Sequence, residues 1–300
     1  MSKYSQLMSK YSQRAGFTLV ELAIVLVIIG LLVGGVLVGQ DLIKAAEIRA
    51  SIKQMEDTNS AVNTFRTKYG GFPGDLNAAR AISFQFIQRN GTTSGNGNGL
   101  IEGAGASAAD NSVFGGENAL VWSDLSLASL IPSNYPGLGT AAVPATGNNG
   151  GVAVTAATRK DFLPQMRIRE GASIHVTVSQ GRNNYALATF TSTATAITTR
   201  AALTPLEAKS IDEKTDDGYP LTGSTVAIGG ADGTANNGVV ATITSGAQAG
   251  WGVAIATTPA TNPCLQASQT VGGVVVPDDY RVTTAGQTAV ACQLVVRASF

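Results

Sequence analysis

Few side chains in this sequence have the type and spacing needed for catalysis or metal binding. The only histidine is His175, and the two cysteines, Cys264 and Cys292, lie outside any CxxC pair. A single histidine excludes most zinc sites, and no GxSxG, HExxH or Walker sequence is present. In an exported chain the two cysteines would form a disulfide, whereas the alternative is two buried thiols. These observations do not favour an enzyme.

Two oxygen-rich segments are candidates for calcium binding. Asp212, Asp216 and Asp217 follow one another at the end of a predicted helix. Acidic residues there oppose the helix dipole, which hints at a nearby positive charge, although an acidic helix end and turn is the favoured alternative. Residues 90–102 alternate oxygen-bearing side chains with glycine, but Glu102 is their only carboxylate. Calcium requires 6–8 oxygens with carboxylates among them, so this segment favours an Asn/Gly turn.

The most unusual ionisable residue is Glu21. It lies in a run from Phe17 to Gly39 that is otherwise apolar except for Thr18. A lone acid inside a membrane segment costs roughly 2.5–3.5 kcal/mol, and by default such residues are interpreted as functional. We therefore expect Glu21 to have a positively charged partner, unless it merely lies near the lipid headgroups.

One long helix is expected to position Glu21. Residues 17–39 would reach about 35 Å as a helix, enough to cross a bilayer core of about 30 Å. Apolar residues then recur at helical spacing as far as Tyr69, and Gly70-Gly71 ends the pattern. The charged residues before the run are all basic, so the positive-inside rule places the N-terminus in the cytoplasm and the body outside. These basic residues are Lys3, Lys10 and Arg14.

Beyond residue 70 the patterns are shorter and predict a mixed body. A helix is expected over 117–131, and another over 204–214 that starts with a Thr204–Glu207 capping box. The expected strands are 173–178, 185–190, 224–229, 238–244, 251–257 and 293–299. The first two would form a hairpin with 181–184 as its turn. His175 would then point away from the apolar row, as a structural or solvated residue.

The composition limits the classes of partner. The chain has 300 residues, 44% of them hydrophobic, with 20 basic and 20 acidic side chains. This length allows one large or two small domains with a buried core. The balanced charge lacks the strongly basic face expected for nucleic-acid binding.

The sequence Gly16-Phe17-Thr18-Leu19-Val20-Glu21 closely resembles the class III signal of type IV pilins and pseudopilins. The resemblance covers about residues 8–75. It implies that a prepilin peptidase cuts after Gly16 and that the new N-terminal residue, Phe17, is N-methylated. It further implies that Glu21 pairs with the N-terminal amine of a neighbouring subunit in a filament.

The same resemblance implies an α+β, pilin-like fold, in which a long N-terminal helix packs against a C-terminal antiparallel sheet. The implied parts are a leader at 1–16, a helix at 17–69 and a globular head at 70–300. Residues 17–39 would form the transmembrane and polymerisation half of the helix. A Cys264–Cys292 disulfide would resemble the C-terminal disulfide-closed loop of many type IV pilins.

The implied function is that of a structural subunit of a type IV pilus-like filament. Its implied partners are other copies of itself in a helical homopolymer, the prepilin peptidase, the membrane and an inner-membrane assembly platform. The precursor would lie in the inner membrane, and the product would be an extracellular pilus or a periplasm-spanning filament. Alternatives are a pseudopilin of a type II secretion or DNA-uptake machine, a minor pilin or adhesin, and a signal-anchored exported enzyme.

Overall fold

The computed structural model describes residues 17–86, 95–103, 116–135, 154–155, 157–179, 181–192, 197–229, 236–237, 264–266, 269–271, 274–276, 279–280, 282 and 291–300. The chain divides into two compact units, Met1–Ala46 and Glu47–Phe300. We call them the N-terminal unit and the head. Since this division falls inside a helix, the domain boundaries expected from the sequence stay predictions.

Helix α1 runs from Leu19 to Tyr69, as the apolar pattern predicted. In its second half, the buried residues recur every three or four positions and form one stripe: Ile48, Ser51, Met55, Thr58, Ala61, Val62 and Phe65. The helix ends where Gly70 adopts a φ of 75°, a left-handed conformation that favours glycine. The predicted stop at Gly70-Gly71 is therefore confirmed.

The other helices of the described chain are short: α2 (Ala78–Ser83), α3 (Gly116–Leu127), the 3-10 turn η1 (Arg159–Asp161) and α4 (Pro205–Thr215). Helix α4 has the predicted capping box, because Glu207 and Thr204 each accept a hydrogen bond from the other's backbone N–H. Helix α3 ends earlier than expected. The N–H groups of Ser129 and Leu130 bond back to Ser126 and Leu125, both at 2.9 Å, and so close the helix before Pro132.

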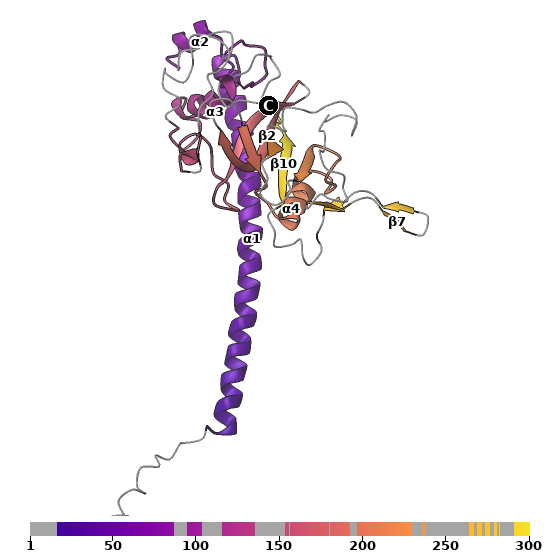
Figure 1. Cartoon of the computed structure of the whole chain (residues 1–300). Coiled ribbons are helices and arrows are strands. Elements are labelled where there is room, and N and C mark those ends of the chain that lie inside the picture. Colours follow the sequence, from indigo (N-terminus) through magenta and orange to yellow (C-terminus); the bar gives the residue numbers. More distant parts are fainter. Residues whose placement is uncertain are drawn as a thin grey trace, which may run out of the picture. The chain divides into compact units, whose positions relative to one another are not determined.

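The head also contains an antiparallel sheet (Figure 1). Its strand order is β4-β10-β2-β3-β5. Strand β1 also pairs with β2, along the edge opposite to the one that β10 occupies. The strands are β1 (Ala172–Ser179), β2 (Arg182–Ser192), β3 (Ile197–Arg200), β4 (Thr225–Gly229), β5 (Asn236–Asn237) and β10 (Cys292–Arg297). Two small ladders lie outside this sheet: β6 (Leu265–Gln266) with β9 (Asp279–Tyr280), and β7 (Gln269–Val271) with β8 (Val274–Val276).

Strands β1 and β2 form the predicted hairpin, with a shorter turn than expected. Ser179 pairs with Arg182, and Gly181 has a φ of 67°, as tight hairpin turns require. The residues expected to extend the turn to 184 instead belong to β2. The strands expected at 224–229 and 293–299 are confirmed as β4 and β10. Those expected at 238–244 and 251–257 lie outside the described residues.

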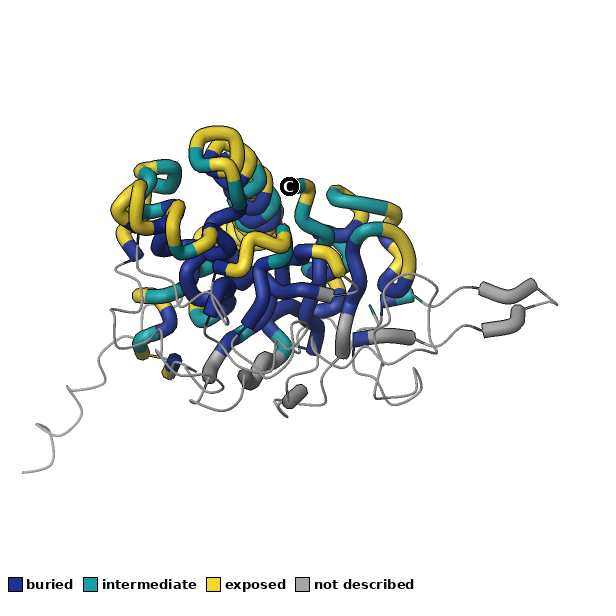
Figure 2. Tube along the Cα trace, turned by 90° about the horizontal axis from the view of Figure 1, so that it is seen from above, coloured by how far each residue is buried: buried dark blue, intermediate teal, exposed yellow. Residues whose placement is uncertain are grey.

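The core of the head lies between the second half of α1 and one face of the sheet. Val62 and Phe65 on the helix and Tyr185 and Leu187 on β2 have no exposed surface. The hydroxyl of Tyr185 donates a hydrogen bond of 3.0 Å to the Asn59 side chain on α1. The buried residues gather in the middle of the head (Figure 2). The expected α+β architecture, a long helix against an antiparallel sheet, is confirmed.

Candidate functional site

The start of α1 is organised by Thr18 and Glu21. The backbone N–H and the hydroxyl of Thr18 both donate to Oε2 of Glu21, at 2.8 and 2.9 Å. The Glu21 N–H donates in return to the Thr18 hydroxyl, at 3.2 Å. This is a capping box, in which residues three apart satisfy N–H groups that the first helical turn leaves unpaired.

This cap was not predicted, although its sequence signature, Thr-x-x-Glu, is present at residues 18–21. From the sequence we expected Glu21 to have a positively charged partner or to lie near the lipid headgroups. In the described chain the hydrogen bonds of Glu21 all use Oε2. A carboxylate can accept about four hydrogen bonds, so Oε1 remains available for another donor. Gly16 lies outside the described residues, and Phe17 is 88% exposed.

The first half of α1 presents an apolar surface on all sides. Its most apolar window has a mean hydropathy of 3.0, and none of that window is buried. In the part of the chain that the structure describes, α1 is the one helix that could cross a membrane by length and composition. A globular protein seldom leaves so large an apolar surface in water, so this surface needs lipid or protein around it.

Comparison with known proteins identifies the segment. The family described as "Prokaryotic N-terminal methylation motif" matches residues 11–37. The chain carries a class III signal, consistent with the type IV pilin and pseudopilin family. This signal implies processing by a prepilin peptidase and a membrane-anchored precursor that is exported. No curated protein and no solved structure matches the chain.

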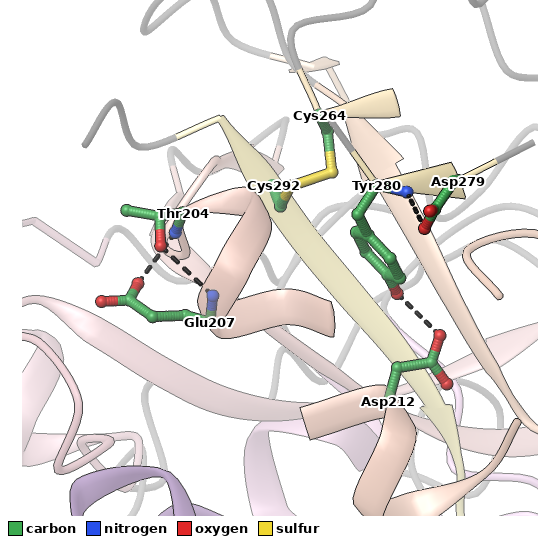
Figure 3. The surroundings of a disulfide bond; sticks show 7 residues. All are labelled: Thr204, Glu207, Asp212, Cys264, Asp279, Tyr280 and Cys292. Atoms are coloured by element: carbon green, nitrogen blue, oxygen red, sulfur yellow. Dashed lines mark hydrogen bonds between the residues drawn. A yellow bond between two sulfur atoms is a disulfide. The ribbon is translucent and has the colours of Figure 1, made fainter. Parts of the chain in front are cut away.

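The class III signal lies in the N-terminal unit, whereas the disulfide lies in the head. Cys264 and Cys292 are bonded, with their Cα atoms 5.0 Å apart, and neither is exposed. Cys292 begins β10, so the bond attaches the segment that leads into β6 to a strand of the main sheet (Figure 3). The disulfide predicted from the sequence is therefore present.

Two clusters of acidic residues lie in the head. The first, which we call the loop cluster, consists of Asp75, Glu102 and Glu117, each no more than 5% exposed. Glu117 accepts hydrogen bonds from the backbone N–H groups of Gly95, Asn96 and Glu102 at 3.0–3.1 Å.

The remaining carboxylates of the loop cluster are held by the same segment. Asp75 accepts from the N–H groups of Gly97 and Gly99, at 2.6 and 2.8 Å. Glu102 accepts from the side-chain amides of Asn96 and Asn98, both at 3.1 Å. The expected Asn/Gly turn thus wraps around carboxylates, two of which come from other segments of the chain.

Burial controls the protonation of the loop cluster. It raises the pKa of Glu117 well above its ordinary value, and the nearby charges of Asp75 and Glu102 act in the same direction. Burial also raises the pKa of Asp75, against the opposing effect of its backbone hydrogen bonds. The close pair Asp75–Glu117 therefore favours a state that retains a proton.

The second cluster, which we call the α4 cluster, is the one expected from the sequence. One carboxylate oxygen each from Asp212, Asp216 and Asp217 lie within 4.8 Å of one another. Asp212 is fully buried, and its Oδ2 accepts a 2.8 Å hydrogen bond from the Tyr280 hydroxyl (Figure 3). Burial raises the pKa of Asp212 to about 7, helped by the charges of Asp217 and Asp216.

His175 is part of the packed interior. His175 is 3% exposed, and its ring lies 4.9 Å from the ring of Phe190. Burial lowers the pKa of His175 to about 4, so the imidazole is neutral at physiological pH. The sequence left open whether His175 is a structural or a solvated residue, and its burial shows that it is structural.

Proposed function

We propose that the chain is a structural subunit of a type IV pilus-like filament. A prepilin peptidase would cut after Gly16, and Phe17 would become an N-methylated N-terminus. The amine of Phe17 would then pair with Glu21 of a neighbouring copy. The observation that carries this proposal is an aligned carboxylate at the start of a helix whose apolar surface is exposed on all sides.

The capping box supports this pairing, because it fixes where the carboxylate points. Thr18 holds Oε2 of Glu21 with two hydrogen bonds, which leaves Oε1 for a cationic donor. A carboxylate alone in an apolar environment is unfavourable. Once it is paired with the amine of a neighbouring copy, it would fix the position of one subunit relative to the next. Removing one partner of such a buried pair costs about 3–5 kcal/mol.

The apolar surface supports association along the same helix. Its exposed members include large side chains on every face of the helix: Leu22, Ile24, Leu26, Val27, Ile28, Leu31 and Leu32. In the membrane these residues contact lipid, and in a filament they would contact the same helix of other copies. One surface thus serves both the anchored precursor and the assembled subunit.

Glu21→Ala should leave leader cleavage intact and impair assembly, because the amine of the neighbouring subunit loses its partner. Filaments sheared from cells that express the full chain with its assembly machinery should fall at least about tenfold, the effect of 1.4 kcal/mol or more. The N-terminus of the protein, read by mass spectrometry in sheared and membrane fractions, reports processing separately from assembly.

Glu56→Gln is the matched control, since Glu56 is an exposed acid on the same helix. It should process and assemble as the unaltered chain does. Normal filament yield from Glu21→Ala would refute the pairing. A processed chain found only in membranes, even without substitutions, would instead assign it to a pseudopilus or a minor subunit.

A further inference from the structure

We propose that the head of one copy contacts the head of the next through two complementary surfaces, one basic and one acidic. The basic surface lies where α1 ends and α2 follows, and the acidic surface lies in the turn after α4. The proposal rests on the proposed function, because it names the contact that heads would make in the same filament.

The basic surface, which we call the basic patch, combines positive charge with exposed apolar groups. Between residues 58 and 86 every exposed charged side chain is basic, and the one acid, Asp75, is 1% exposed. In the same segment Phe84 is 46% exposed and Ile82 is 60% exposed. Aromatic residues and arginine are the types most enriched at the centres of protein interfaces. The basic patch consists of Arg66, Lys68, Tyr69, Arg80, Ile82 and Phe84.

Contacts within the basic patch hold it together. Nζ of Lys68 lies 5.0 Å from the centroid of the Tyr69 ring. That ring meets the Phe84 ring edge to face, with the two centroids 5.0 Å apart. Arg80 donates a hydrogen bond to the Gly70 carbonyl, just past the end of α1. These contacts place charges and aromatic rings on one continuous surface.

The basic patch keeps its charge, because none of its cations forms an ion pair with a residue that the structure describes. Lys68 and Arg80 contact a ring and a carbonyl, and the Arg66 guanidinium lies 4.8 Å from the centroid of the Phe72 ring. Neither a ring nor a carbonyl cancels a full charge. Three cations on one surface therefore favour an acidic partner.

The acidic surface, which we call the acidic turn, is built in a similar way from residues of opposite charge. Asp216 and Asp217 accept hydrogen bonds from neutral backbone N–H groups, of Thr225 at 3.2 Å and of Tyr219 at 2.9 Å respectively. Tyr219 is 46% exposed and supplies an aromatic ring beside the acids. The acidic turn consists of Glu213, Asp216, Asp217 and Tyr219.

The two lysines of α4 do not neutralise the acidic turn. Lys209 pairs with Asp279 at 3.0 Å, and Lys214 donates to the Ser210 carbonyl at 3.2 Å. Behind the turn, Oδ1 of Asp212 is buried without a hydrogen-bond partner. The acidic turn therefore lacks positive charge and hydrogen-bond donors, which a cationic partner from outside the head would supply.

The positions of the two surfaces favour a second copy of this chain as the partner. Helices α2 and α4 lie on opposite sides of the head (Figure 1). When the basic patch of one head meets the acidic turn of another, the remaining acidic turn and basic patch stay open for further copies. Contacts of this heterologous kind continue from copy to copy and generate a ring or an open helical array.

In this contact the cations of the basic patch would face Glu213 and Asp217 of the next copy, and Tyr219 would meet Phe84. Complementary charges determine the partner and its orientation more than they raise affinity. The apolar helices would thus supply most of the association, whereas the two surfaces would fix the direction in which the heads follow one another.

The test reverses the charge on each surface, and then on both, in the full chain expressed with its assembly machinery. Lys68→Glu and Glu213→Lys should each lower the yield of sheared filaments at least about threefold, because like charges would then meet. The chain that carries both substitutions should recover most of the yield, since the two altered residues would again attract each other.

Lys160→Glu is the matched control, because Lys160 is exposed on η1, outside both surfaces. It should assemble as the unaltered chain does. Lys68 and Glu213 are also exposed, so their variants, purified in detergent, should unfold at the same temperature as the unaltered chain. A lower yield at an unchanged unfolding temperature reports the contact between heads rather than the stability of each head.

A second measurement reads the contact without relying on filament yield. Chains with Lys68→Cys and chains with Glu213→Cys are expressed together and treated with a short bis-maleimide reagent, in membranes and in sheared material. The native cysteines are bonded to each other, so the reagent joins only the new thiols. Crosslinked dimers should form when both chains are present and not when either is expressed alone.

Normal filament yield from both single reversals would overturn the proposal, as would a doubly altered chain that recovers nothing. Loss of filaments in Lys68→Glu but not in Glu213→Lys would assign the basic patch to an acidic partner other than this chain. If the unaltered chain forms no filaments, the proposed function fails, and crosslinking decides whether heads still meet through these surfaces. Absence of crosslinked dimers in every fraction would show that they do not.

Discussion

The two acidic clusters of the head contain the same kind of side chain but differ in what surrounds them. In the loop cluster, Glu117 and Asp75 together accept five backbone N–H groups from residues 95–102. In the α4 cluster, Asp212 is buried with one oxygen unbound. Both clusters receive donors from the chain itself, but among the described residues only the α4 cluster has a buried carboxylate oxygen without a hydrogen-bond partner.

This difference shows that the number of carboxylates does not by itself identify a metal site. Both clusters contain three acids, and the loop cluster also has the Asn/Gly spacing that faintly resembles a calcium loop. A glycine-rich segment exposes backbone N–H groups and can satisfy buried carboxylates without an ion. The hydrogen-bond partners of each oxygen, rather than the number of acids, describe how such a cluster is held.

The largest expected effect comes from removing the centre of the loop cluster. Glu117→Ala leaves the N–H groups of Gly95, Asn96 and Glu102 without their acceptor. Two of these bonds, from Gly95 and Glu102, are buried. Each buried donor left unpaired costs roughly 1–3 kcal/mol, so the unfolding free energy should fall by at least about 2 kcal/mol. Urea unfolding of the full chain, followed by the fluorescence of the neighbouring Trp122, measures this loss.

Glu213→Ala provides the comparison for Glu117→Ala, because it removes an exposed acid of the same size. Its unfolding free energy should change by less than about 0.5 kcal/mol. Equal losses in the two variants would mean that the N–H groups around Glu117 do not depend on its carboxylate, and the contrast between the clusters would disappear.

A smaller effect is expected at Gly74, which donates its N–H to Asp124 at 2.6 Å and has a φ of 86°. A methyl group there would clash with the carbonyl oxygen of Glu117. Gly74→Ala should therefore destabilise the head by more than about 1 kcal/mol, a loss that thermal unfolding can measure. Gly181→Ala is the control, since Gly181 shares the left-handed conformation but has open space around it. Equal losses of stability in the two variants would mean that the clash with Glu117 does not cause the destabilisation.

The last prediction concerns the pH dependence of stability and uses Glu117→Gln, which resembles the protonated acid. Burial raises the pKa of Glu117 from 4.5 to about 8, so the folded head retains a proton that the unfolded chain releases. Its contribution to stability is thus complete below pH 4.5 and decreases as the pH rises through 8. Unfolding measured between pH 4.5 and 9 should show this decrease, and Glu117→Gln should make it shallower. An unchanged slope would assign the proton to another group.

The long helix was predictable from the sequence because its signals are local and repeated. The apolar run, the periodicity up to Tyr69 and the glycines that follow all act within one or two turns. The α4 cluster was also predictable, since residues 212, 216 and 217 are close neighbours on a helix and its turn. The capping box at Thr18 was equally local and was missed only because the charge of Glu21 had another explanation.

The loop cluster could not be predicted, for a physical reason. Its carboxylates come from residues 75, 102 and 117, and the donors come from the segment between them. Only the folded head brings Asp75 and Glu117 to the same turn. The side chain of Asn183 holds that turn as well, because it accepts from the Ile101 N–H and donates to the Gly99 carbonyl. Sequence patterns report spacing along the chain and carry little information about such distant pairs.

The place of β10 in the sheet has a consequence for biogenesis. This strand is the last in chain order, yet it pairs with β2 on one side and β4 on the other. Until residues 292–297 have been synthesised and have crossed the membrane, the two parts of the sheet have no strand to join them. The head must therefore complete its folding only after translocation has finished, when α1 is already anchored. A ribosome stalled before Cys292 would leave a tethered but unfinished head exposed to proteases and chaperones outside the cytoplasm.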